Sequence, residues 1–206
     1  MISAPVDEGT QLSKGERTRQ AILEQAAARA SELGLESLSL GTLAEDLEMS
    51  KSGLFAHFGS REELQLATIE YALGRFVEEV IDPVHEVPAG IEQLRGLCES
   101  WLSYVERGVF PGGCFFSMVT SEFANRPGGV RDRLEWLMNQ WLARLERAIR
   151  AGKSKGQIKP EINTKRFAFE LFSIGDTASV YYGVFGSTGI SNARRAISER
   201  IDDAAT

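Results

Sequence analysis

Residues 39–58, SLGTLAEDLEMSKSGLFAHF, carry the pattern from which the rest of the chain can be interpreted. Apolar residues at helical spacing predict two short helices joined by a turn at Glu48-Met49. Ser39 and Ser50 precede the two helices, and serine is a favoured N-cap because its hydroxyl accepts a hydrogen bond from a free backbone N–H. Two short helices around a tight turn predict a helix-turn-helix, whose second helix enters the major groove of DNA.

The polar residues on and beside the second helix are the candidate DNA contacts. Lys51 and Ser52 fall in its first turn, the part of a recognition helix that usually meets base edges. Gly53 has no side chain, so the backbone can approach DNA closely there. The remaining candidates, which can contact the DNA backbone, are Thr42, Phe55, His57 and Arg61. The alternative interpretation of this pattern is a small three-helix core with a solvated face.

The composition limits the function classes that need consideration. The chain of 206 residues has a formal net charge of −6, so we expect weak non-specific attraction to DNA and a reliance on base contacts and dimerisation. No apolar run approaches the length of a membrane span, and two cysteines without a metal-ligand cluster fit a reducing cytoplasm. No nucleophile–base pair or phosphate-binding loop is present. We therefore expect a cytoplasmic protein that is not an enzyme and uses no metal or cofactor.

From Arg17 to about Phe76 the chain resembles the DNA-binding domain of the TetR (tetracycline-repressor) family. The matching pieces, at the family's spacing, are Ala26–Gly34, Leu43-Ala44, Ser50-Lys51, Gly53-Leu54, His57-Phe58 and Ser60-Arg61-Glu62. The resemblance implies a homodimer that binds a palindromic operator and is usually released by a small ligand in its C-terminal domain.

Two positions depart from the family's pattern. Phe55 stands where the family commonly has tyrosine, so this side chain can pack against sugar or a thymine methyl but cannot donate to phosphate. Leu40 and Gly41 stand where a polar or basic DNA contact is often found. Both changes affect the assignment of individual DNA contacts more than the resemblance to the family.

Helical periodicity continues through most of the chain and predicts an all-α protein of nine helices. Together with the resemblance, this implies a nine-helix TetR-like architecture. Residues 1–13 are then expected to be a disordered tail, 14–76 the DNA-binding domain, and 77–206 a ligand-binding and dimerisation domain. Gly34 is expected to end the first helix and Asp82-Pro83 the fourth. Besides the two helices within 39–58, the predicted helices are 16–33, 60–81, 89–107, 114–125, 130–155, 164–185 and 191–202.

Aromatic residues are frequent in the later helices, and most of them are expected to form core. A small-molecule pocket also uses aromatic walls with a few polar handles, here Tyr104 and Asp176. The candidate effector-binding residues are Trp101, Tyr104, Phe115, Met118, Trp141, Phe172 and Asp176. Cys114 begins a predicted helix, and helix N-termini favour the reactive thiolate, so it is a candidate redox sensor. The alternative is that Cys114 is a small buried apolar residue, as we expect for Cys98.

The predicted helix 164–185 carries a stripe of small residues that would let two helix backbones approach closely. Together with the last helix, it predicts a four-helix dimer interface around a two-fold axis. The candidate interface residues are Phe172, Gly175, Ser179, Tyr182, Gly183 and Ile197. On this interpretation Gly175→Trp should give monomers. The alternative is that these residues fill the core of a single protomer.

The predicted function is a ligand-responsive, DNA-binding transcriptional regulator, and specifically a homodimeric repressor that a small molecule releases from a palindromic operator. A repressor needs only to occupy its operator, so two linked conformational states are sufficient. The expected partners are double-stranded DNA, a small-molecule effector and a second copy of the chain, with no membrane. The alternative is an architectural or partner-binding protein of the same fold without a small-molecule inducer.

Overall fold

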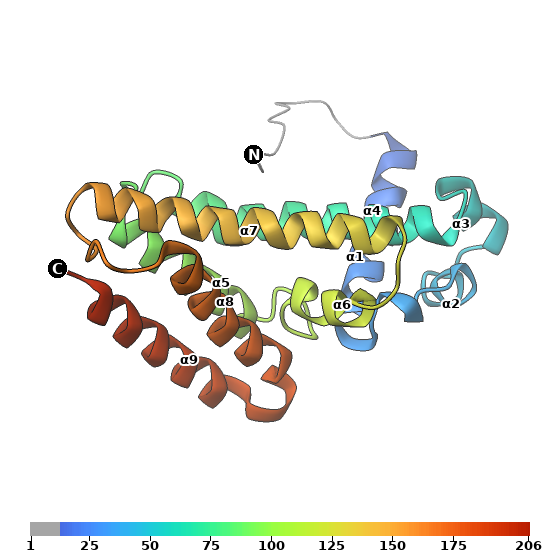
Figure 1. The fold of residues 1–206 in the computed structure, drawn as a ribbon. Helices are drawn as coiled ribbons and strands as arrows, with labels where there is room; N and C mark the ends of the chain where they lie inside the picture. Colours follow the sequence, from blue (N-terminus) through green and yellow to red (C-terminus); the bar gives the residue numbers. More distant parts are fainter. Residues whose placement is uncertain (1–12) are drawn as a thin grey trace. The chain divides into compact units, whose positions relative to one another are not determined.

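The computed structural model describes residues 13–206 apart from the side chain of Leu40, and these residues form nine α-helices and no β-sheet (Figure 1). The predicted all-α, nine-helix architecture is therefore confirmed. None of the helices in this part of the chain is long and apolar enough to cross a membrane. The helices are α1 (Lys14–Leu33), α2 (Leu40–Asp46), α3 (Lys51–His57), α4 (Arg61–Phe76), α5 (Ile91–Glu106), α6 (Phe115–Phe123), α7 (Gly129–Ser154), α8 (Thr164–Val180) and α9 (Tyr182–Ala204).

Three shorter helical segments follow α1 and α4. A 3₁₀ turn, η1 (Leu35–Ser37), follows α1, and its Leu35 is completely buried. The helical stripe of α1 predicts a buried Leu33, but this side chain is 60% exposed because the chain turns at Gly34 and Leu35 takes the inner position. After α4 come a π-helical turn, η2 (Val77–Ile81), and a 3₁₀ turn, η3 (Asp82–Val84).

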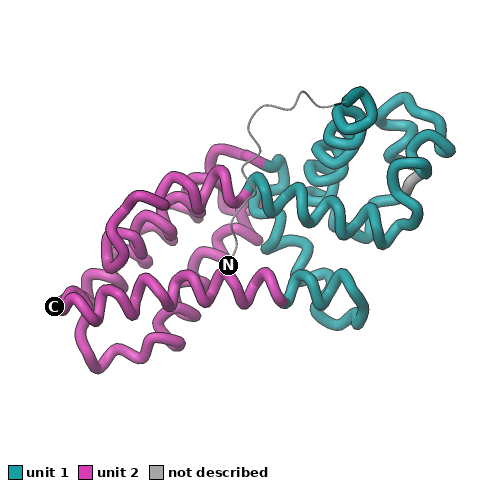
Figure 2. Tube along the Cα trace, turned by 90° about the horizontal axis from the view of Figure 1, so that it is seen from above, with its two compact units in different colours: residues 1–75, 110–135 teal, residues 76–109, 136–206 magenta. Residues whose placement is uncertain are grey.

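The chain folds into two compact units (Figure 2). The first unit holds the described residues up to Arg75 together with 110–135, and the second holds 76–109 and 136–206. The predicted boundary at residues 76 and 77 lies beside the first crossing of the chain between the units. The prediction divided the chain at a single point, so it could not place α6 and the start of α7 in the first unit.

The helix ends in the first unit follow the local signals in the sequence. Ser39 accepts a hydrogen bond from the Thr42 N–H and so caps α2, while Ser50 caps α3. Gly34 ends α1 with a positive φ of 84°, as expected. Ser13, the only residue of the predicted tail within the described chain, forms a capping box with Glu16 and starts α1 earlier than predicted.

A close backbone contact joins α1 to the segment that precedes α6. The N–H of Gly112 donates to Ser31 Oγ at 3.0 Å. The Glu122 carboxylate on α6 accepts from the backbone N–H groups of Leu35, at 2.7 Å, and Glu36, at 3.1 Å. A Cβ at position 112 would lie 1.8 Å from the carbonyl oxygen of Ser31, so only glycine fits there. These contacts are the reason that α6 belongs to the first unit.

In the second unit, α5 lies against both α8 and α9, and α8 packs along α9 (Figure 1). Arg194 on α9 forms ion pairs with Glu99 and Glu106 on α5, and the hydrogen bond to Glu99 raises the pKa of the Arg194 guanidinium. These charged groups are partly exposed, and such pairs contribute only about 0–1 kcal/mol each. Apolar burial must therefore hold these helices together. The buried apolar residues include Leu94, Leu97, Leu102, Phe167, Leu171, Ile197 and Ile201.

The corner between the last two helices differs from the prediction. The first of the pair ends at Val180 instead of continuing to residue 185, and Asn163 caps its start. The second begins at Tyr182 and contains a kink at Gly186, where φ is 55° and ψ is −148°. The apolar pattern runs through this corner without interruption, so periodicity alone extends the first helix too far.

We expect Gly112→Ala to lower the free energy of unfolding by about 1–3 kcal/mol, because the added methyl group must displace backbone atoms. Urea denaturation followed by circular dichroism measures this change. Gly74→Ala is the matched control, because no atom lies within 4 Å of the added Cβ and the position is helical. Equal stability of the two variants would contradict the proposed constraint at Gly112.

Candidate DNA interface and effector-binding cluster

Helices α2 and α3 pack against each other in the first unit (Figure 1). Leu54 and Phe58 are buried, which leaves Lys51, Ser52 and Phe55 exposed. The turn between the helices places Glu48 in the left-handed region, with φ at 52°. The predicted turn and the two serine caps are thus present. The exposed face of α3 has the arrangement that a recognition helix requires.

Lys51 lies alongside the first turn of α2. A Cβ placed on Gly41 would be 3.5 Å from both Cε and Nζ of Lys51. The small residue at Gly41, which departs from the family's pattern, therefore leaves room for the Lys51 side chain. Gly53 also has an internal role, because its N–H donates to Ser50 Oγ at 3.1 Å and a Cβ there would be 3.0 Å from the same oxygen.

The other predicted DNA contacts differ in how much of each group is available. Phe55 is 53% exposed and offers only apolar surface. His57 is half-buried, and its ring packs beside Phe58. The Thr42 hydroxyl is hydrogen-bonded within its own helix turn. Its local partners do not prevent Thr42 from accepting a further hydrogen bond, but they do fix its orientation.

Arg61 is occupied by a structural role that the sequence did not indicate. Its Nε donates to the Leu38 carbonyl at 3.0 Å, and a terminal nitrogen donates to the Glu36 carbonyl. It also pairs with the Glu36 carboxylate at 3.4 Å. The guanidinium therefore connects the start of α4 to the segment before α2. About half of the side chain is still exposed, so a phosphate contact from Arg61 stays a prediction.

Five aromatic rings of the second unit form one cluster, to which α4, α5, α7 and α8 each contribute. Trp101 and Trp141 lie edge to face with their centroids 5.6 Å apart. Phe76, which sequence reasoning did not select, contacts Trp141 at 5.3 Å and Tyr104 at 5.6 Å. Phe172 lies parallel to Trp101 at 6.1 Å. Four of the predicted effector-binding residues are thereby brought together.

The remaining predicted effector-binding residues are not part of this cluster. Phe115 and Met118 belong to the first unit, where Phe115 packs against Phe110 and Phe116. Asp176 is half-buried on α8. The aromatic composition of α6 made it similar to the other helices in sequence, but α6 packs on α1 in the first unit.

Two buried donors in this cluster lack an acceptor. The indole N–H groups of Trp101 and Trp141 are fully shielded from solvent, and no described group accepts a hydrogen bond from either. Most buried polar groups in folded proteins are paired, and leaving one unpaired costs about 1–3 kcal/mol. The cluster therefore has hydrogen-bonding capacity that the chain itself does not use.

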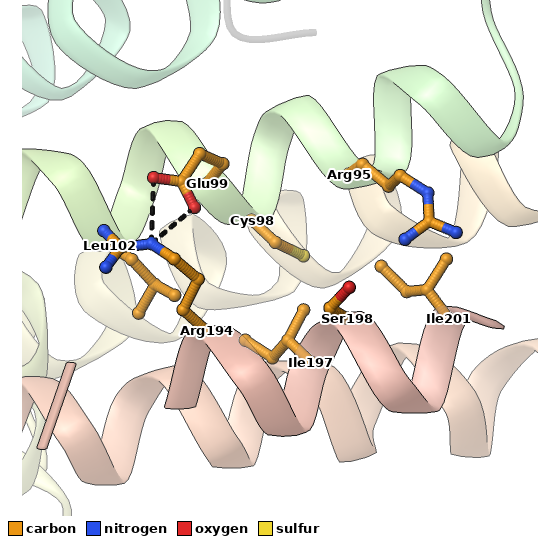
Figure 3. A pocket seen from close by; sticks show the side chains of 8 residues that line it. All are labelled: Arg95, Cys98, Glu99, Leu102, Arg194, Ile197, Ser198 and Ile201. Carbon is orange, nitrogen blue, oxygen red and sulfur yellow. Dashed lines mark hydrogen bonds and ion pairs between the residues drawn. The ribbon is translucent and has the colours of Figure 1, made fainter. Parts of the chain in front are cut away.

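Three of the predicted dimer-interface residues are buried within the protomer. A Cβ on Gly175 would lie 2.4 Å from Cζ3 of Trp101, so this glycine serves the packing of its own protomer. Ser179 is buried and donates to the Gly175 carbonyl at 2.8 Å. Ile197 is buried between α9 and α5 (Figure 3). Because Gly175→Trp would disrupt the protomer, loss of dimers in that variant would not report on an interface.

An apolar groove between α8 and α9 offers a different surface for a second copy. It has a volume of about 630 Å³. Tyr181, Val184 and Phe185, where α8 ends and α9 begins, are exposed. Of the predicted interface residues, Gly183 is exposed, and Phe172 and Tyr182 are half-buried. The groove is lined by Ser173, Ile174, Thr177, Ala178, Phe185, Thr188, Gly189, Asn192, Ala193 and Ala196.

Neither cysteine forms a disulfide, and both are buried. Cys98 extends from α5 toward α9 at a cavity of about 150 Å³ (Figure 3). Burial, with a smaller effect of Glu99, raises the pKa of the Cys98 thiol to about 12, which makes the thiolate rare. Cys114 is the N-cap residue of α6 and is only 2% exposed, so a reagent could reach it only after local opening. In the described chain no three metal-ligating side chains come together.

Two family models match the chain. The model described as "Bacterial regulatory proteins, tetR family" matches residues 22–68. The model described as "Tetracyclin repressor-like, C-terminal domain" matches residues 90–197. Among curated proteins, none matches this chain.

Solved structures of similar fold cover almost the whole chain. A TetR transcriptional regulator from Chloroflexus aurantiacus J-10-FL has a TM-score of 0.86 at 22% identity, over 94% of this chain and 98% of that one. A TetR-family regulator from Cytophaga hutchinsonii has a TM-score of 0.82 at 22% identity, over 96% and 99%. AibR, solved in complex with isovaleryl coenzyme A and operator DNA, has a TM-score of 0.71 at 24% identity, over 87% and 95%. At these identities the likeness concerns the fold.

If the groove between α8 and α9 is the dimer interface, Phe185→Asp should convert dimers to monomers, because it places a charge on an apolar surface without a partner. Sedimentation velocity measures the change. Leu33→Asp is the matched control, since Leu33 is 60% exposed and Phe185 is 59% exposed, but Leu33 belongs to the first unit. A wild-type monomer, or a Phe185→Asp dimer, would show that this surface does not join two copies.

Proposed function

Since the chain belongs to the TetR family of bacterial regulatory proteins, we propose that it is a DNA-binding transcriptional repressor. In this proposal a homodimer occupies a palindromic operator in the cytoplasm, and a small molecule releases it. The observation that carries the proposal is the capped α2–α3 corner, in which burial of Leu54 and Phe58 turns Lys51, Ser52 and Phe55 outward. Such a surface fits the major groove of DNA.

The proposed DNA contacts divide by the chemistry that each side chain can offer. Lys51 and Ser52 can donate to base edges from the first turn of α3, and Phe55 can pack against a thymine methyl. Thr42, Gly53, His57 and Arg61 would contribute contacts to the DNA backbone, with Arg61 the least available of these because of its carbonyl partners. Few of these groups are cationic, which agrees with a chain of net charge −6.

Weak electrostatic attraction makes a second copy important for affinity. A two-fold dimer presents two recognition helices about 34–36 Å apart, one turn of DNA, so the contacts of both half-sites act together. The exposed groove of α8 and α9 supports such a dimer because most of its accessible surface is apolar and the aromatic residues Tyr181 and Phe185 beside it are exposed.

Ligand response is supported by the aromatic cluster of the second unit and by the path of the chain. The chain crosses between the two units three times, after residues 75, 109 and 135, and the last crossing lies inside α7. A ligand that prefers one arrangement of the second unit can therefore bias the first through continuous helix. The contact of Gly112 with Ser31 ties α6 to α1, so these elements would move together with the DNA-reading corner.

Selection of genomic fragments by the purified protein tests DNA binding directly. We expect the enriched fragments to share a palindrome whose half-sites are about one helical turn apart, because a two-fold dimer imposes that spacing. Sequencing of the bound fragments is the measurement. Enrichment without a shared palindrome would contradict the dimeric operator complex and favour an architectural role.

Lys51→Ala should weaken binding to such a fragment by about tenfold or more, since a specific base contact is worth about 1–3 kcal/mol. Fluorescence anisotropy with a labelled fragment measures the dissociation constant. Lys165→Ala removes another exposed charge, from α8 in the second unit, and should leave affinity unchanged. Unchanged affinity of Lys51→Ala would remove this residue from the interface.

A further inference from the structure

The unpaired donors of the aromatic cluster define what a bound molecule must supply. Trp101 is 3% exposed and Trp141 is 4% exposed, and each indole N–H can donate but cannot accept a hydrogen bond. The centroids of the two rings are only 5.6 Å apart, so the two donors belong to the same cluster. A molecule that satisfies these two indoles needs an acceptor atom.

The direction of one donor follows from how Trp101 is packed. The atoms of this ring nearest to a Cβ on Gly175 would be Cζ3 at 2.4 Å, followed by Cε3 and Cη2 at 2.9 Å. All three belong to the six-membered ring, on the side away from the nitrogen. The nitrogen side of the Trp101 ring therefore lies away from Gly175. Replacing Gly175 would force this ring, and its donor, to move.

The walls of the cluster determine the shape and polarity of the molecule. Phe76, Tyr104 and the two indoles are buried, and Phe172 is the one half-exposed ring of the five. Phe172 lies within 7° of parallel to Trp101. Aromatic walls of this kind favour a flat, apolar body, which can pack with its face or its edge against them.

We infer that this cluster binds a flat, apolar molecule that carries a hydrogen-bond acceptor, such as a ring nitrogen or a carbonyl oxygen, and that the indole N–H groups of Trp101 and Trp141 recognise that acceptor. The inference rests on the proposed ligand response and names the chemical class of the effector. The acceptor distinguishes this class from purely apolar molecules, which would leave both donors unpaired.

Quinoline and naphthalene provide a matched pair of probes. They have the same shape and differ in a ring nitrogen that accepts a hydrogen bond. We expect the full chain to bind quinoline about five- to tenfold more tightly in equilibrium dialysis, the effect of one hydrogen bond on a binding constant. Equal affinity for the two probes, or binding of neither, would overturn the inference.

The indole N–H resonances locate the contact independently of any variant. The chain has three tryptophans, so ¹⁵N-labelled protein gives three indole cross-peaks. Quinoline should shift the peak of Trp101 or Trp141 downfield more than naphthalene does, and leave Trp136, which is 41% exposed, unchanged. A shift confined to Trp136, or the same small shift with both probes, would show that the donors do not recognise an acceptor.

Phenylalanine substitutions test the donors while keeping an aromatic ring. Trp101→Phe and Trp141→Phe together should reduce the preference for quinoline to about onefold, whereas Trp136→Phe should retain it. If the double variant does not fold, the resonances of the wild-type chain decide the question. A preference that survives in a folded double variant contradicts the inference.

Release of DNA is a separate measurement. Quinoline binding with the expected preference but no loss of DNA affinity would support the site and contradict the proposed ligand response. Enrichment of a palindrome together with absence of the quinoline preference would support the proposed DNA binding and overturn only the inference about the effector.

Discussion

The contact between the backbone at Gly112 and the carbonyl of Ser31 constrains the rest of the structure. It leaves no space for a side chain at position 112, and it fixes the chain at the point where it enters α6. The Glu122 carboxylate then holds the free N–H groups at the start of η1, from the opposite end of α6. Since α1 and η1 are both attached to the α6 region, the unit with the α2–α3 corner is built from two separate parts of the chain.

This construction bears directly on how a regulator of this kind can work. If α6 belonged with the second unit, a change there could reach the DNA-reading corner only through α4. Instead, the chain enters the first unit a second time before α6 and leaves it inside α7. In the proposed regulator, the effector cluster and the recognition helix are thus linked by several continuous stretches of backbone, and a modest difference in ligand affinity between two arrangements is enough to shift the population.

The features predicted correctly from sequence are those fixed by neighbours along the chain. Ser39 and Ser50 cap helices because each hydroxyl reaches an N–H three residues later, and Gly34 ends α1 through its positive φ. The features that were missed depend on residues distant in sequence or on backbone conformations that the sequence pattern does not reveal. Nothing near Glu122 in sequence shows that it caps η1, and nothing near Gly186 shows that the chain bends there.

Gly175 shows why a stripe of small residues is ambiguous in sequence. Such a stripe lets something large approach, but sequence spacing does not say whether that is a second helix or a side chain of the same protomer. Here it is the Trp101 ring, and the face of α8 that includes Gly175 and Ser179 is buried inward. The adjacent face, with Ile174 and Ala178, lines the groove. Because one helix borders both the aromatic cluster and the proposed dimer surface, a ligand that displaces Trp101 against Gly175 would also shift that surface.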